Sequence, residues 1–257
     1  PKLVILRGGE NEADGAYIRG AMKRGGLCGV DVELRTLAAD VSADTLARTL
    51  KAVNGDSAVH GCLLQRPLPG QLKAAESGLC ALLDPRKDVD GMTPVSAAGV
   101  FTGSGEGFPP CTAQACMALL DYYHIDCAGK SAAVVGRSAV VGRPAAMLLL
   151  ARNATVTVCH TGTKDVAAVT READIIITAA GAAGSLTAAH VRPGQVVVDV
   201  STNWNGVSLC GDAVFDDVSQ IVEASTPVPG GVGAVTSAVL MAHTVRAAEY
   251  MTGEGGL

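Results

Sequence analysis

The chain has 257 residues, a net charge of −5, and contents of 48% hydrophobic, 18% charged and 3% aromatic residues. It has no basic tract and few rings that could stack on bases, which argues against nucleic acid as a partner. It has neither a signal peptide nor an apolar stretch of membrane-spanning length, so we expect no membrane partner and a cytoplasmic location.

The first 70 residues alternate between short apolar runs and stretches of helical period. In chain order, we expect a strand at 3–6, a helix at 12–25, a strand at 30–34, a helix at 42–53 and a strand at 59–65. Two prolines and a glycine in RPLPG end the last of these strands. Strands that alternate with helices in this way predict a parallel sheet.

Two polar stretches rich in glycine and proline, DPRKDVDGMTP and then GSGEGFPP at 103–110, precede a second run of alternating elements. We therefore place a domain boundary near residue 110. The apolar strands after it read as buried on both faces, as in a doubly wound α/β sheet. We expect strands at 131–135, 155–159, 175–178 and 196–200, and helices at 112–124, 142–151 and 233–250.

The eight cysteines contain no C-x-x-C pair, and most of them lie in apolar runs. We therefore expect buried, reduced thiols. The five histidines show no spacing typical of metal ligands, so we predict no metal site.

The stretch GRSAVVG, residues 136–142, lies between a predicted strand and a predicted helix. Backbone N–H groups at a helix start favour a pyrophosphate, so the turn indicates a dinucleotide site. Ser138 replaces the middle glycine of the usual G-x-G-x-x-G pattern, and an ordinary tight turn is the alternative interpretation.

The end of the next strand indicates which dinucleotide is bound. NAD sites usually place a carboxylate there for the ribose 2′-OH, but this chain offers Thr161 and Thr163 and no carboxylate before Asp165. Together with Arg137 in the preceding turn, these hydroxyls favour NADP. Alternatively, Arg137 is a solvated turn cation and NAD is possible.

Three further motifs could contact a substrate. Gln65 follows a parallel strand at the sheet edge where α/β proteins bind ligands. Asp88 and Asp90 lie in the loop KDVDG, although an aspartate before glycine is most often a turn former. The loop TPVPGGVGAVT, residues 226–236, contains glycines that would let a ligand approach the backbone.

These motifs follow one another as GENEADGAY, LLQRPLP, DPRKDVDGMTP, PCTAQACMALL, VVGRSAVVGRP and TPVPGGVGAVT. Together they resemble the methylenetetrahydrofolate dehydrogenase/methenyltetrahydrofolate cyclohydrolase family from Lys2 to about Tyr250. The resemblance implies a homodimer whose chains have two α/β domains and a cleft between them. Residues 1–110 and a C-terminal helix at about 237–257 would form the folate-binding catalytic domain, and residues 111–236 the NADP-binding Rossmann-type domain. Family members usually begin with a helical segment, so we expect one to be missing before Pro1.

The resemblance also implies a reaction. The family transfers a hydride from 5,10-methylenetetrahydrofolate to NADP and then hydrolyses the methenyl product. By similarity, Tyr17, Gln65 and Asp90 would be the catalytic residues and would also contact the reduced folate. Pro229, Gly230 and Gly233 would form one wall of the substrate site. The dinucleotide site would be lined by Thr112, Gly136, Arg137, Ser138, Thr161, Ala179, Val200, Thr202 and Thr236.

One catalytic residue of the family is missing. Its lysine lies four residues after the tyrosine, and Ala21 occupies that position here. Lys23 lies about 200° further round the helix, at roughly 100° per residue. Arg19, like Lys23, lies on a helix face other than that of Tyr17 and Ala21. Arg24 lies on their face but one turn beyond Ala21, and an arginine is a poor proton shuttle because it hardly deprotonates. We interpret all three cations as solvated.

Our main hypothesis is therefore an NADP-dependent dehydrogenase of one-carbon folate metabolism whose cyclohydrolase activity is weak or lost. The alternatives are a fully bifunctional enzyme and a catalytically silent folate- or nucleotide-binding protein. Smaller departures from the family pattern could alter ligand affinity without changing the fold, and these are Arg66, Ala113, Ser201 and Ala234.

Overall fold

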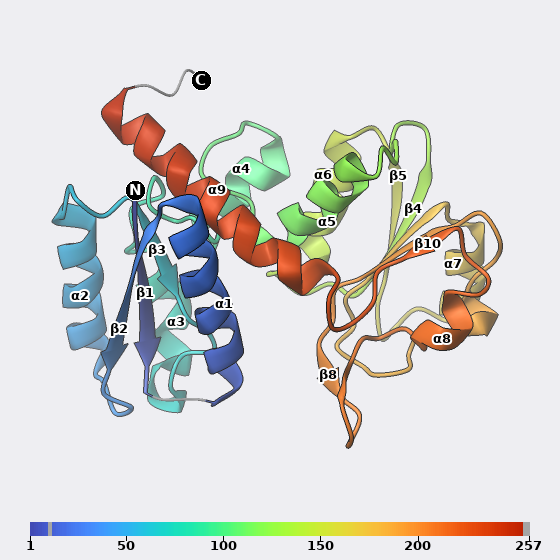
Figure 1. The fold of residues 1–257 in the computed structure, drawn as a ribbon, viewed down its shortest axis with the longest axis horizontal. Coiled ribbons are helices and arrows are strands. Elements are labelled where there is room, and N and C mark those ends of the chain that lie inside the picture. The colour runs from blue at the N-terminus through green and yellow to red at the C-terminus, as the bar shows by residue number, and fades with distance from the viewer. Residues whose placement is uncertain (10–11, 254–257) are drawn as a thin grey trace. The chain divides into compact units, whose positions relative to one another are not determined.

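The computed structural model describes residues 1–9 and 12–253. Glu10 and Asn11 of the GENEADGAY stretch, and the last four residues of the expected C-terminal helix, lie outside these ranges. Contacts divide the chain into two compact units. Unit 1 comprises Pro1–Cys111 and Ser237–Leu257, and unit 2 comprises Thr112–Thr236. Figure 1 traces the elements of both units.

Unit 1 is built on a three-stranded parallel sheet with the order β2-β1-β3. Leu3 of β1 stands between Val32 of β2 and Gly61 of β3, which sets the register. The four central residues of β1 are buried, as expected for a parallel strand covered on both faces. The strands are β1 (Lys2–Gly8), β2 (Asp31–Leu37) and β3 (Gly61–Leu64).

Helices cover both faces of this sheet. On one face, α2 and α3 pack with Val4 and Leu64 into an apolar core. On the other face, α1 and α9 lie so close that a Cβ added to Gly25 would overlap Val32 and touch Met241. The helices are α1 (Glu12–Cys28), α2 (Ala43–Gly55), α3 (Glu76–Cys80), α4 (Pro94–Thr102) and α9 (Val232–Thr252), whose first residues belong to unit 2.

Local sequence explains where two of these helices begin. Ser42 caps α2 by accepting a hydrogen bond from the Thr45 N–H at 3.2 Å. Thr93 caps α4 in the same way, with Pro94 directly after the cap, where its missing N–H costs nothing. Both caps fix the direction in which the preceding loop enters the helix.

Unit 2 contains a five-stranded parallel sheet with the order β10-β7-β6-β4-β5. The order reverses beside β4, because β5 lies on one side of it and β6 on the other. The strands are β4 (Ser131–Val135), β5 (Thr155–Cys159), β6 (Ile175–Thr178), β7 (Val196–Asp199) and β10 (Ala224–Ser225). A short antiparallel hairpin follows β7 and comprises β8 (Asn203–Trp204) and β9 (Leu209–Cys210).

The core of unit 2 lies on the face of the sheet that α7 and α8 cover. Ala133, Ile176 and Val197 of the strands pack there against Val169 of α7 and Val218 of α8. The other helices of the unit are α5 and α6, and α6 contacts both β4 and β5. The bounds are α5 (Cys111–Tyr122), α6 (Gly142–Ala151), α7 (Val166–Glu172) and α8 (Phe215–Val218).

The α/β fold class is confirmed, and each strand and helix predicted in chain order overlaps an observed element. Two expectations were wrong in detail. β5 is not buried on both faces, because it is an edge strand and exposes Thr155, Thr157 and Val158. Six of the eight cysteines are buried, but Cys28 is exposed at the end of α1.

Candidate functional site

The three residues predicted to contact folate come from different elements of unit 1. Tyr17 lies in α1, Gln65 directly follows β3, and Asp90 lies in the loop before α4. The Gln65 N–H donates to the Leu6 carbonyl at 2.8 Å, which fixes this residue at the carboxyl end of the sheet. All three side chains are half-buried.

Ala21 lies on the buried face of α1 together with Tyr17. Tyr17, Ala21 and Gly25 are spaced by four residues and therefore share one face of the helix. Ala21 has 0% exposure, and Gly25 packs directly against β2. Arg19 and Lys23 are exposed, so neither brings an amine or guanidinium to the buried face.

Asp90 is the titratable group of this set with the most informative surroundings. Burial raises its pKa to about 6, while the Arg66 guanidinium and the hydrogen bonds from Cys111 act in the opposite direction. Burial, and after it the negative charge of Asp90, raise the pKa of Tyr17 as well. At neutral pH this places a carboxylate beside a neutral phenol, which together can accept and donate hydrogen bonds.

In unit 2, both glycines of the GRSAVVG turn are required by packing. Gly136 has φ +123°, and a Cβ there would overlap the carbonyl oxygen of Ala179. A Cβ on Gly142 would overlap the Gly136 carbonyl oxygen in turn. The Ser138 hydroxyl accepts hydrogen bonds from the N–H groups of Val141 at 3.1 Å and Gly142 at 3.3 Å, which ties the turn to the first residue of α6.

The predicted dinucleotide residues follow the carboxyl ends of adjacent strands. Gly136 follows β4, Ala179 follows β6 and Val200 follows β7, while Thr161 lies two residues beyond the end of β5. Loops after neighbouring parallel strands share one edge of the sheet, where α/β folds bind nucleotides. The GRSAVVG turn and this edge of the sheet together fit a dinucleotide. Thr112 lies at the start of α5 and Thr236 in α9, where the Thr236 hydroxyl donates to Val232.

Arg137 is exposed in the turn after β4. Among the residues that the structure describes, its guanidinium makes no hydrogen bond or ion pair with another side chain. Its charge is therefore available to an anion, as the hypothesis of a 2′-phosphate requires.

A cavity of about 230 Å³ in unit 2 brings together residues that were predicted for two different ligands. Val200 and Thr202 come from the dinucleotide set, and Pro229, Gly230 and Gly233 come from the substrate set. The loop 226–236 and the end of β7 thus line one space.

Comparison with known proteins supports the same two-part organisation. A model of the tetrahydrofolate dehydrogenase/cyclohydrolase catalytic domain matches residues 1–90. A model of the NAD(P)-binding domain of the same proteins matches residues 110–252. The chain belongs to the tetrahydrofolate dehydrogenase/cyclohydrolase family.

Relatives in this family cover nearly the whole chain. "Bifunctional protein FolD" of Carboxydothermus hydrogenoformans is 45% identical over 256 residues, which are 98% of this chain and 88% of that protein. The crystal structure of bifunctional FolD from Campylobacter jejuni is 38% identical, with a TM-score of 0.93 over 97% of this chain and 88% of that one. The Trypanosoma brucei enzyme, complexed with NADP cofactor and inhibitor, is 32% identical, with a TM-score of 0.92 over 98% and 88%.

Sequence reasoning missed one polar residue beneath the dinucleotide edge of this family member. Asp212 is fully buried, and its carboxylate accepts hydrogen bonds from five groups. These are the hydroxyls of Thr178 and Ser201, the N–H groups of Ala180 and Ala182, and the Asn203 amide. This residue lies in the stretch GDAVFDDV, residues 211–218, but its contacts span up to 34 residues and leave no local signal.

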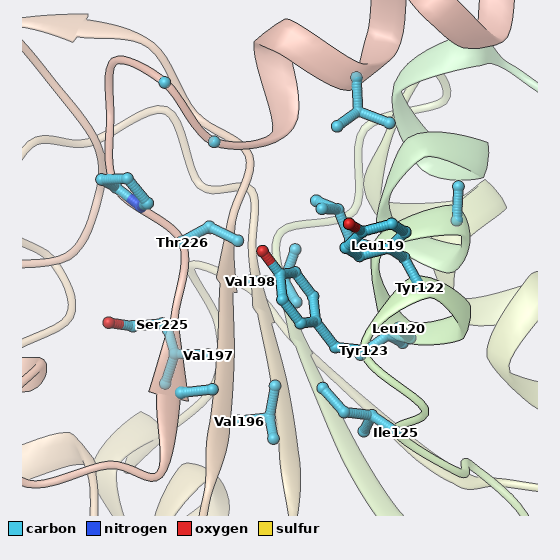
Figure 2. A pocket seen from close by; sticks show the side chains of 16 residues that line it. Leu119, Leu120, Tyr122, Tyr123, Ile125, Val196, Val197, Val198, Ser225 and Thr226 are labelled. Carbon is cyan, nitrogen blue, oxygen red and sulfur yellow. The ribbon is translucent and has the colours of Figure 1, made fainter.

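Unit 2 also contains a larger apolar groove of about 700 Å³. Figure 2 shows the ring of Tyr123, just beyond α5, reaching across it toward Val198 and Thr226. None of the lining residues is charged, and Gly230 alone of them belongs to the predicted site set. The groove therefore offers no cation to a folate or dinucleotide anion.

Within residues 1–9 and 12–253, no helix is long and apolar enough to cross a membrane. No three histidine, cysteine, aspartate or glutamate side chains in those ranges come together as they would around a metal ion.

Proposed function

We propose that the protein oxidises 5,10-methylenetetrahydrofolate to the methenyl compound with NADP, in one-carbon folate metabolism. Membership of the tetrahydrofolate dehydrogenase/cyclohydrolase family supports this reaction. The observation that carries it is the half-buried Asp90 carboxylate of KDVDG, with its pKa raised to about 6 by burial and with Tyr17 nearby. Such a group is ionised at neutral pH and can accept hydrogen bonds from the N–H groups of a pterin.

The residues of unit 1 would bind and orient the folate. Asp90 would accept from the pterin ring, and hydrogen bonds to a charged acceptor contribute about 1.5–3 kcal/mol each. Tyr17 would contact the folate from α1, and Gln65 from the end of β3. Hydride transfer chiefly requires that the one-carbon bridge be held in position, so orientation would supply much of the rate.

The residues of unit 2 would hold NADP, which supplies the hydride acceptor. The glycine turn would receive the pyrophosphate at the start of α6, and Arg137 would meet the 2′-phosphate. The NADP complex of the T. brucei relative supports this cofactor. NAD is the alternative, because hydroxyls such as that of Thr161 can also bind a 2′-OH.

For the second reaction of the family, hydrolysis of the methenyl product, the sequence and the relatives favour different answers. Relatives named bifunctional, at 40–45% identity, favour a chain that also hydrolyses the methenyl product. Ala21 favours weak hydrolysis, because a positioned acid or base typically contributes 10²–10⁴-fold. We therefore propose a bifunctional enzyme whose hydrolysis proceeds without an amine from residue 21 and is correspondingly slow.

The first test is spectrophotometric. Purified protein receives methylenetetrahydrofolate with NADP or with NAD, and NADPH or NADH formation is followed. We expect rapid reduction with NADP and a much lower kcat/KM with NAD. No reduction with either cofactor would contradict the dehydrogenase and would favour the silent binding protein.

The second test concerns hydrolysis. Methenyltetrahydrofolate is supplied alone, and its spontaneous hydrolysis is subtracted. We expect a small catalysed rate that Ala21→Lys raises at least about tenfold, within the usual range for a restored acid or base. Gly20→Lys, one position away on a helix face with free space, is the control. A wild-type rate that matches hydride transfer would contradict the weak-hydrolase proposal.

The homodimer and the cytoplasmic location remain predictions from family resemblance and composition. Sedimentation of the purified chain at micromolar concentration would test the homodimer, because a mass of one chain at all concentrations would contradict it.

A further inference from the structure

The loop that carries Asp90 is fixed by buried polar side chains. Lys87, which is 3% exposed, leads the loop. Its ammonium donates hydrogen bonds to the carbonyl oxygens of Val53 at 2.8 Å, Asn54 at 3.0 Å and Asp56 at 2.7 Å. These carbonyls lie at the C-terminal end of α2, where a cation also complements the helix dipole. Lys87 therefore ties the start of the loop to α2.

The next residue ties the loop to a second helix. The fully buried Asp88 carboxylate accepts from the N–H groups of Met92 at 2.9 Å and Thr93 at 2.8 Å, and from the Ser96 hydroxyl at 2.6 Å. These donors lie at the start of α4, so the carboxylate closes the loop around Asp90.

The contact nearest to Asp90 involves the Val89 carbonyl. His243 Nδ1 lies 2.9 Å from this oxygen, and Cys111 Sγ lies 3.1 Å from it. A carbonyl oxygen only accepts, so Nδ1 must carry the hydrogen. Burial lowers the pKa of His243 to about 4, which keeps the ring neutral at physiological pH. His243 is 7% exposed and packs against the Phe108 ring, with centroids 5.1 Å apart.

We propose that His243 is a positioning residue for Asp90 and acts through the Val89 carbonyl. The carbonyl of Val89 and the N–H of Asp90 belong to one planar peptide unit. A donor that fixes this plane also fixes the direction in which the Asp90 side chain leaves the backbone. The inference rests on the proposed function, because it assigns Asp90 to folate binding.

The position of His243 suits this role better than a purely structural one. It lies on α9, 154 residues from Val89, and reaches the loop from outside its own segment. Its neighbour Thr244 is just as buried but donates only within α9, to the Leu240 carbonyl at 2.8 Å. Of these two adjacent buried residues, His243 therefore forms a hydrogen bond with the Asp90 loop and Thr244 does not.

The charged and titratable groups around Asp90 come from several elements. Tyr17 faces it from α1, Arg66 from the residues after β3, Cys111 from the start of α5, and Asp88 from its own loop. Cys111 donates its backbone N–H to the Asp90 carboxylate. If the peptide plane turns, this donor is lost while burial remains, so Asp90 should then be protonated at higher pH.

The test compares three variants of the full chain. His243→Leu removes the donor at similar volume, His243→Asn keeps an N–H donor on a shorter side chain, and Thr244→Val is the matched control. Steady-state rates give KM for methylenetetrahydrofolate, KM for NADP, and the pH profile of kcat/KM. Carbon NMR of labelled aspartate gives the titration of Asp90 without any substrate, with Asp90→Asn to assign its signal.

We expect His243→Leu to raise the KM for methylenetetrahydrofolate about tenfold and to leave the KM for NADP unchanged. The acidic limb of its pH profile of kcat/KM should move to higher pH by about half a unit. His243→Asn should bring the KM for methylenetetrahydrofolate back to within about twofold of the wild type and should return the acidic limb toward its wild-type pH. Thr244→Val should match the wild type in both. Equal loss in the Asn and Leu variants would overturn the inference, as would an unchanged Asp90 titration and folate KM in folded His243→Leu.

Two safeguards keep the outcome decisive. If His243→Leu does not fold, the comparison of His243→Asn with His243→Ser takes its place, and equal folate KM values for the two would overturn the inference. If the wild type reduces no NADP, the proposed function fails, while the NMR titration still tests the link from His243 to Asp90.

Discussion

The two predicted ligand sites are built by opposite means. In unit 1, the Asp90 loop is fixed by side chains, since Lys87, Asp88 and His243 each form buried hydrogen bonds with backbone or helix ends. In unit 2, the GRSAVVG turn depends on two residues without side chains. Gly136 and Gly142 let the backbone of the turn pack directly against other backbone carbonyl groups. The first site depends on contacts from distant segments and the second on a short local sequence.

This difference determines how each site should fail. A turn of close-packed backbone has no room to adjust, so one added methyl group should abolish its geometry. A loop held by several hydrogen bonds should lose function in steps as each bond is removed.

Gly136→Ala should be the most damaging change. The residue has φ +123°, and an added Cβ would overlap the Ala179 carbonyl oxygen. We expect the KM for NADP to rise roughly 100-fold, because small displacements of a binding group can change rates that much. Gly129→Ala is the control, since it has φ +72° with free space around the Cβ position. An equal effect of both changes would mean that backbone conformation alone, and not the close approach, is responsible.

Asp90→Asn should reduce kcat/KM for methylenetetrahydrofolate roughly 50-fold, since hydrogen bonds to charged groups contribute about 1.5–3 kcal/mol. Burial raises the pKa of Asp90 to about 6, so the active carboxylate is present above that pH and is lost as the pH falls through it. Wild-type kcat/KM should therefore fall below pH 6, and Asp90→Asn should lack this limb.

The exposed Asp31 supplies the control for this prediction. Asp31→Asn should leave both the rate and the acidic limb unchanged. An acidic limb that persists in Asp90→Asn would assign the titration to another group and would remove the main support for the folate site.

Lys87→Met should lower the free energy of unfolding by about 2 kcal/mol, because the carbonyl groups of Val53, Asn54 and Asp56 lose the ammonium as a donor. Urea unfolding measures this loss, and the folate KM should rise only a few-fold because Asp88 and His243 still hold the loop. Lys51→Met, an exposed position on α2, should change stability by less than about 0.5 kcal/mol. A loss of all activity in folded Lys87→Met would show that the loop does not fail in steps.

Ser201→Ala should have the smallest effect. The Ser201 hydroxyl donates to Asp212 at 2.8 Å and accepts from the Gly181 N–H at 3.2 Å, which links the loops after β6 and β7. Four other donors still hold Asp212, so we expect the KM for NADP to rise about threefold. The exposed Ser208→Ala should be neutral, and a larger effect of Ser201→Ala on folate KM than on NADP KM would contradict this assignment.

The same contrast explains what the sequence could predict. The glycine turn and the long strands were found because their signals are local, such as glycine spacing and apolar runs. The two-residue β10 was missed because it is too short to have a pattern, and the exposure of β5 depends on its place at the sheet edge. Neither is determined by the residues of the segment alone.

The candidate sites follow the same rule. Asp90 and Gln65 could be named from motifs, but the bond from His243 to Val89 joins residues 154 positions apart. The Asp212 network likewise gathers donors from β6, from the loops after β6 and β7, and from β8. Such contacts follow from the packing of elements against one another, which sequence periodicity does not encode.

The central claim is that this chain transfers a hydride from the one-carbon bridge of methylenetetrahydrofolate to NADP. The most direct measurement supplies folate that is deuterated at that bridge and analyses the reduced cofactor by mass spectrometry. We predict one deuterium in each NADPH formed, and far less NADPH in total when Asp90→Asn or Gly136→Ala is incubated for the same short time. Reduced cofactor without deuterium, or no reduced cofactor from the wild type, would contradict the claim.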